Sequence, residues 1–120
     1  MLCVAGPWEK AGQCREVEMP FAVQREHYIL SPYFDYLSFL FRRDWRYPAR
    51  DTLGLMIKLA DSDAGGISGG RISKSLTPVD RERLAEGVAL CTEILRRFGM
   101  KQEQLFLGTV NAGHPGGSLP

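Results

Sequence analysis

The sequence has 120 residues, of which 44% are hydrophobic and 24% are charged, a composition typical of a folded globular chain. Its net charge is +1, and its basic residues form no run longer than the pairs Arg42-Arg43 and Arg96-Arg97, which excludes a nucleic-acid binder that relies on a basic surface. No apolar stretch is long enough to span a bilayer, and no basic region followed by an apolar run opens the chain. We therefore expect a cytoplasmic protein without a transmembrane segment.

The cysteines also bound the possible chemistry. Cys3, Cys14 and Cys91 form no Cys-x-x-Cys pair and are odd in number. Disulfide frameworks and zinc sites need paired or regularly spaced ligands. We therefore expect reduced thiols and no metal site.

The first part of the chain is predicted to contain one strand. Residues 1–15 hold Gly6, Pro7 and Gly12, which favour an irregular connection. Apolar residues then recur at every second position from residue 19 to residue 23, which predicts a strand over residues 18–30 with a bulge at residues 25–27.

A short helix is predicted next. Ser31 can act as an N-cap and Pro32 can occupy the first helical turn. Residues 33–41 are so rich in aromatic and aliphatic side chains that this helix must be covered by other protein or serve as a contact surface. Residues 42–50 form a charged and aromatic connection after it.

The middle of the chain predicts a β-hairpin. Leucine and isoleucine recur at every second position from residue 53 to residue 59, which indicates a strand with one buried face. Residues 61–70 are rich in glycine, serine and aspartate and are typical of a turn region, in which Asp61 and Asp63 are interpreted as turn formers. Residues 71–76 are expected to return as the second strand of this hairpin.

The strongest local pattern predicts a helix over residues 78–98. Thr77 is a favourable N-cap, Pro78 suits the first helical position, and Asp80 places a carboxylate in the first turn. Gly99 can take the left-handed C-cap conformation. The buried face is expected to consist of Leu84, Val88, Cys91 and Leu95. The fold class that follows is α+β, an antiparallel sheet with helices packed on one face.

The end of the chain carries the candidate catalytic residue. His114 precedes Pro115 and two glycines, so the backbone can approach a ligand closely while the imidazole is held in one direction. An imidazole of ordinary pKa, about 6.5, is largely neutral at pH 7 and can accept a proton. The residues alone support two interpretations, a general base and a structural loop histidine.

The pattern of the second half resembles a known enzyme family. From Ser62 onward, a strand, a Gly/Arg-containing return strand, a Thr-Pro-x-Asp helix start and then His-Pro-x-Gly-Ser follow in the order found in the substrate domain of glucose–methanol–choline oxidoreductases, which oxidise alcohols with FAD. The resemblance implies that His114 is the active-site base and that Asn111, His114 and Pro115 lie against the flavin. The substrate would be a small alcohol. Ser118-Leu119-Pro120 departs from the family's usual Thr-Cys-Arg-Met continuation, which leaves the identity of the alcohol open.

The resemblance also implies that the chain is incomplete. The family's FAD-binding fingerprint precedes the matching region, and a second active-site polar residue follows the histidine stretch. We therefore expect residues 1–120 to be part of a substrate domain, inactive by itself and unable to bind FAD alone. The alternative is a stand-alone α+β binding or protein-interaction module without catalysis, in which residues 33–41 form the contact surface.

Overall fold

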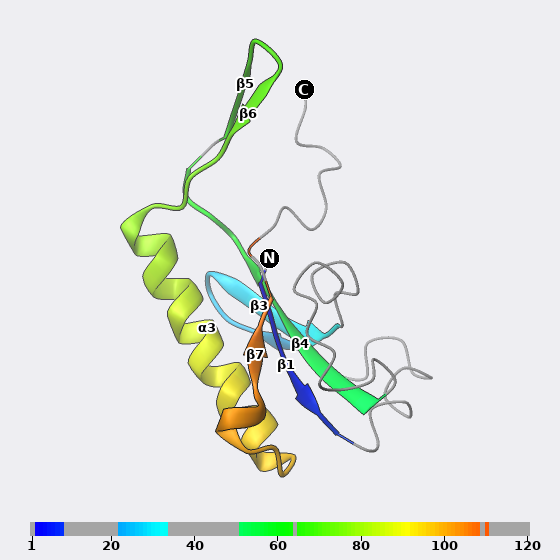
Figure 1. Ribbon diagram of the computed structural model, residues 1–120. Coiled ribbons are helices and arrows are strands. Elements are labelled where there is room, and N and C mark those ends of the chain that lie inside the picture. The colour runs from blue at the N-terminus through cyan, green and yellow to red at the C-terminus, as the bar shows by residue number, and fades with distance from the viewer. Residues whose placement is uncertain (1, 9–21, 34–50, 64, 109, 111–120) are drawn as a thin grey trace.

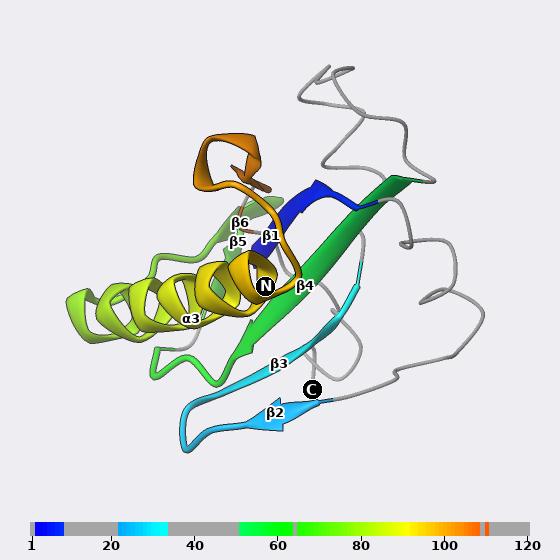
Figure 2. The ribbon, with the colours of Figure 1, turned by 90° about the horizontal axis from the view of Figure 1, so that it is seen from below.

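The computed structural model describes residues 2–8, 22–33, 51–63, 65–108 and 110, the side chain of Ile72 excepted. These residues form a five-stranded sheet in the order β2-β3-β4-β1-β7 and a separate two-stranded sheet, β5-β6. Every strand pair is antiparallel. The helix α3 (Pro78–Arg97) lies across one face of the larger sheet, as Figures 1 and 2 show. The expected α+β class, an antiparallel sheet covered by helix on one face, is confirmed.

The strand β4 (Thr52–Leu59) lies at the centre of the sheet and was predicted from its alternating pattern. Leu53, Leu55 and Ile57 are buried in the main core, while Lys58 is exposed. On one side β4 pairs with β1 (Leu2–Pro7), with Val4 opposite Leu55. The prediction of an irregular connection over residues 1–15 is therefore wrong for β1, whose residues from Leu2 to Gly6 are all buried, on both faces of the sheet.

On its other side β4 pairs with β3 (Tyr28–Pro32), which in turn pairs with β2 (Val23–Gln24). The single strand predicted over residues 18–30 is wrong in its described part. Residues 25–27 make a tight turn, in which the Arg25 N–H donates to the Tyr28 carbonyl over 2.9 Å. The chain therefore reverses direction where a bulge was expected.

The predicted helix start at Ser31 and Pro32 is also wrong. Both residues belong to β3, where Ser31 lies opposite Met56 and Pro32 lies opposite Leu55. Proline is tolerated at the end of this strand, because a strand end can forgo one N–H donor. Of residues 33–41, the described one is Tyr33, whose N–H donates to the Gly54 carbonyl over 3.0 Å.

The hairpin predicted from residues 53–59 and 71–76 does not form. Instead, β5 (Gly66–Ser68) pairs with β6 (Arg71–Ser73) across the two-residue turn Gly69-Gly70. Both glycines have positive φ, 55° and 74°, as the type I′ turn of a two-residue hairpin requires. Figure 1 shows this hairpin projecting past the N-terminal end of α3, away from the larger sheet.

The predicted helix over residues 78–98 is confirmed as α3, and both of its ends agree closely with the prediction. Thr77 accepts a hydrogen bond from the Asp80 N–H, and the Asp80 carboxylate accepts one from the Thr77 N–H, which makes a capping box. At the C-terminal end, Gly99 has φ 91°, and the Met100 N–H donates to the Leu95 carbonyl over 3.3 Å. This is the hydrogen bonding of a Schellman motif, and buried Met100 packs into the core with Leu95.

The core lies between α3 and the larger sheet. Leu84, Cys91 and Leu95 are buried as predicted, and Val88 packs against them partly buried. A short 3₁₀ turn (Gln102–Gln104) then leads into β7 (Phe106–Leu107), which pairs with β1 at the edge of the sheet. The sheet residues in this core are Leu2, Val4, Tyr28, Leu30, Leu53, Leu55 and Ile57.

Candidate functional site

The residues of the predicted active site, Asn111, His114 and Pro115, lie outside the described residues. The structure describes the chain that leads to them. The Gly108 N–H donates to the Cys3 carbonyl over 2.7 Å, which continues the pairing of β7 with β1 beyond Leu107. A hydrogen bond of this length is well formed, so the edge of the sheet is held in register up to Gly108.

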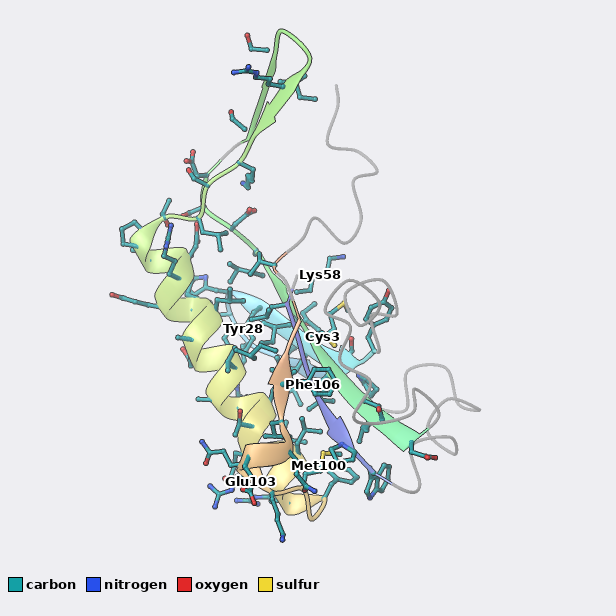
Figure 3. The ribbon with its side chains drawn as sticks, viewed as in Figure 1. Cys3, Tyr28, Lys58, Met100, Glu103 and Phe106 are labelled. Carbon is teal, nitrogen blue, oxygen red and sulfur yellow. The ribbon has the colours of Figure 1, made fainter. Side chains whose placement is uncertain are left out.

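The two faces of the larger sheet differ in character. Tyr28 points to the α3 side, and Lys58 extends from the opposite side, as Figure 3 shows. This second face presents short side chains near its centre, and several of them are buried: Cys3, Ala5, Ser31 and Thr52. The Cys3 thiol donates a hydrogen bond to the Tyr33 carbonyl over 3.1 Å.

A fully buried carboxylate, that of Asp80, holds the most connected polar cluster among the described residues. Ser62 donates to it twice, from its hydroxyl at 3.0 Å and from its backbone N–H at 3.2 Å. The Thr77 N–H donates at 3.4 Å, and Arg83 Nη1 lies 3.5 Å from Asp80 Oδ1. These contacts tie the chain after β4 to the N-terminal end of α3.

The Asp80 carboxylate is held in its charged form. Burial acts to raise its pKa, but the hydrogen bonds from Thr77 and Ser62 outweigh that effect and lower the pKa below the ordinary value of 3.8. A carboxylate whose oxygens are occupied by donors and whose pKa is lowered is a poor proton acceptor at neutral pH. The Asp80 carboxylate therefore holds the segment after β4 against the start of α3, and it is not suited to act as a general base.

Arg83 extends this cluster to the turn between β2 and β3. Its Nη2 lies 3.4 Å from His27 Nε2, and Glu26 Oε1 lies 3.6 Å from the same ring nitrogen. The sequence patterns predict His27 within the strand of residues 18–30, at the expected bulge. The structure places it in the turn, half-exposed and beside α3.

Tyr28 makes a second link between the sheet and α3. Its hydroxyl donates to Glu86 Oε1 over 2.8 Å, while its ring packs in the core. Burial, and then the hydrogen bond to Glu86, raise the pKa of Tyr28 above 10.0. The phenol therefore stays protonated at neutral pH and remains a donor to Glu86.

The described part of the chain holds neither a cluster of metal-ligating side chains nor a helix that could span a membrane. None of its His, Cys, Asp and Glu side chains gather in groups of three or more that could hold a metal ion. Likewise, no helix within this part has the length and apolar character needed to cross a bilayer.

Comparison with known proteins finds similarity over part of the chain. The chain is 31% identical over 70 residues to the uncharacterized protein MJ1450 of Methanocaldococcus jannaschii. The aligned region covers 58% of this chain and 18% of that relative, so the chain corresponds to a small part of a longer protein. No family model matches the chain. No solved structure matches it either.

Sequence patterns identify some of these polar residues and miss others. Thr77 and Asp80 are predictable as a cap because they are three residues apart before a helix. Ser62 is 18 residues from Asp80, and no local pattern signals their contact. His27 and Arg83 are 56 residues apart, and their contact depends on the turn that replaces the expected bulge.

Proposed function

We propose that this chain is part of the substrate domain of an FAD-dependent alcohol oxidoreductase, with His114 as the catalytic base. The observation that carries the proposal is the His-Pro-x-Gly-Ser sequence that follows a helix opened by Thr-Pro-x-Asp. An antiparallel sheet with a helix on one face is compatible with the substrate domain of such enzymes. The buried Cys91 thiol, which is in no disulfide, fits a reducing, cytoplasmic location, which we propose as well.

The proposed roles follow from the chemistry of alcohol oxidation. A flavin, when bound, would supply the two-electron acceptor that oxidation of an alcohol requires. His114 accepts the proton of the substrate hydroxyl on an imidazole nitrogen, so that the alcohol becomes a carbonyl compound as its proton and hydride depart. By the same resemblance, Asn111 and Pro115 would contact the flavin together with His114.

The described residues bear on where the flavin's diphosphate can be held. A helix N-terminus is a favourable anion site only when its N–H donors are available. At α3 these donors face the Thr77 hydroxyl and the Asp80 carboxylate, which already supplies a negative charge. The N-terminal end of α3 therefore does not fit a diphosphate. As the resemblance implies, the FAD-binding domain of the longer enzyme would hold that group.

A stand-alone binding module without catalysis is the second candidate. It is favoured by the projecting hairpin of β5 and β6, whose Ile67 is 58% exposed, and by Tyr33, which is 44% exposed. Exposed apolar side chains on a projecting element are common at sites of protein contact. FAD binding by a longer protein that contains this chain separates the two candidates.

The experiment is flavin reduction in that longer protein, with histidine variants as a matched pair. His114→Ala should leave FAD bound and slow reduction by the alcohol by about 10²–10⁴-fold, the usual effect of removing a general base. His27→Ala removes the other histidine of this chain, which lies in the β2–β3 turn, and should leave the reduction rate unchanged. Reduction of the His114→Ala enzyme at the wild-type rate would exclude the proposed role of His114, and a colourless protein without FAD would favour the binding module.

A further inference from the structure

The hairpin formed by β5 and β6 is the most exposed element among the described residues. All its described side chains are exposed, and among the strands that the structure describes β5 pairs with β6 alone. Lys74 holds the base of the hairpin, through an ion pair with Asp61 at 2.7 Å and a hydrogen bond to the Asp63 carbonyl. A two-stranded hairpin is only marginally stable alone in water, so further strands on either edge would stabilise it.

The outer edge of β5 offers backbone groups for such pairing. In a two-residue turn the residues that flank it, Ser68 and Arg71, form the hydrogen-bonded pair. Antiparallel pairs alternate between hydrogen-bonded and open ones, so the next pair, Ile67 and Ile72, is open. The backbone N–H and C=O of Ile67 therefore point away from β6, toward the free edge of the hairpin.

The two edges of the hairpin differ in charge. Residues 65–69, which include β5, contain no charged side chain and no proline. Natural edge strands are usually protected by charges, proline, bulges or short length; β5 has no charge and no proline, and its three-residue length is the protection that it does have. The β6 edge carries Arg71 and is followed by Lys74. If two copies of the chain paired through β6, these cations would lie close together and repel each other.

We propose that β5 is a self-association edge, which pairs antiparallel with β5 of a second copy of this chain. A register centred on Ile67 is symmetric, and it places Gly66 opposite the partner's Ser68 and Gly65 opposite the partner's Gly69. No like charges meet, and the exposed Ile67 side chains of the two copies become neighbours on one face. The low net charge of +1 adds little repulsion between the copies.

The contact is small, so the dimer is weak. We expect a dissociation constant on the order of 0.1–1 mM, because interfaces of a few residues bury little surface. Sedimentation velocity over a concentration series that spans this range measures it directly on the full chain.

Two proline variants form a matched pair for the test. Ile67→Pro removes an N–H that points outward from β5, and Ile72→Pro removes the equivalent N–H of β6; neither N–H is used within the hairpin. Ile67→Pro should remain monomeric over the whole series, while Ile72→Pro should dimerise like the wild type. Ile67→Lys keeps the backbone donor and places two cations opposite each other, so it should also weaken dimerisation, by roughly fivefold.

The outcomes decide the proposal. A wild-type chain that is monomeric up to millimolar concentration would overturn it. So would dimers that survive both Ile67→Pro and Ile67→Lys, since these would form through another surface. Equal loss of dimerisation in both proline variants, with Ile67→Lys unchanged, would show that the proline variants act through the hairpin fold and would also reject the β5 edge.

Discussion

A Cβ atom placed on Gly87 would lie 2.9 Å from Cγ2 of Ile57, so α3 crosses β4 at a point where a glycine is required. Two further atoms of the Ile57 side chain would lie at 3.4 and 3.5 Å from that Cβ. Gly87 has ordinary helical geometry, and its lack of a Cβ atom allows the helix to approach the centre of the sheet closely. This contact sets the depth of the core between α3 and β4.

Gly87→Ala is therefore expected to destabilise the fold. Alanine has a helix propensity about 1 kcal/mol better than glycine, but overpacking a buried contact costs about 1–3 kcal/mol. We expect a net loss of about 1 kcal/mol in the free energy of unfolding, measured by urea denaturation. Ala89→Gly at an exposed position of α3 calibrates the propensity term in the same helix. If Gly87→Ala stabilises the protein by as much as Ala89→Gly destabilises it, the crowding against Ile57 is absent.

The elements that the sequence predicted correctly carry local signals. The helix α3 has its cap, its periodic apolar residues and its left-handed Gly99 within one continuous segment. The strand β4 alternates between the core and the second face of the sheet. Neither prediction needs knowledge of a distant partner.

The strands that were missed depend on pairing across the chain. β1 is buried on both faces, so its sequence shows a short apolar run without alternation, and Gly6 and Pro7 suggest a loop. For β5 and β6, the Gly69-Gly70 turn is a strong hairpin signal, but the glycine-rich segment of residues 61–70 also fits a long connection between two longer strands. The candidate base His114 is likewise predicted from a local motif alone, and it lies outside the described residues.

The C-cap of α3 provides a second stability prediction. Gly99 adopts φ 91°, which costs a residue with a Cβ about 1 kcal/mol, and nothing within 4 Å of its position would clash with a side chain. Gly99→Ala should therefore lower the free energy of unfolding by about 1 kcal/mol, and Gly99→Asn by less, since asparagine tolerates this conformation better. Equal losses for both variants in urea denaturation would indicate that the backbone conformation is not the cause.

Cys91 is expected to be inert toward thiol reagents in the folded protein. Burial in the core raises the pKa of its thiol to about 12, so almost no thiolate exists at pH 8. Treatment with iodoacetamide followed by peptide mass spectrometry should find Cys91 unmodified in buffer and fully modified in guanidinium chloride. Rapid labelling of Cys91 in buffer would contradict the packing of α3 against the sheet.

The Asp80 cluster predicts how stability changes in acid. Its folded-state pKa is lowered below 3.8 by the hydrogen bonds from Thr77 and Ser62, whereas the unfolded chain has the ordinary value. The carboxylate therefore contributes stability that is fully present above pH 3.8 and is lost as the pH falls through the folded-state pKa.

Asp80→Asn isolates this contribution. The variant lacks the charged acceptor for Ser62 and Thr77, so its Tm at pH 7 should be lower than that of the wild type. All other carboxyl groups titrate in both proteins, so the difference in Tm should shrink as the pH is lowered past 3.8. Ser62→Ala removes the hydroxyl donor and should weaken acid stability in the same direction, whereas Ser68→Ala in the exposed hairpin should have no effect. A difference in Tm between wild type and Asp80→Asn that stays constant from pH 7 to pH 2 would show that the charge of Asp80 does not stabilise the contact between Ser62 and α3.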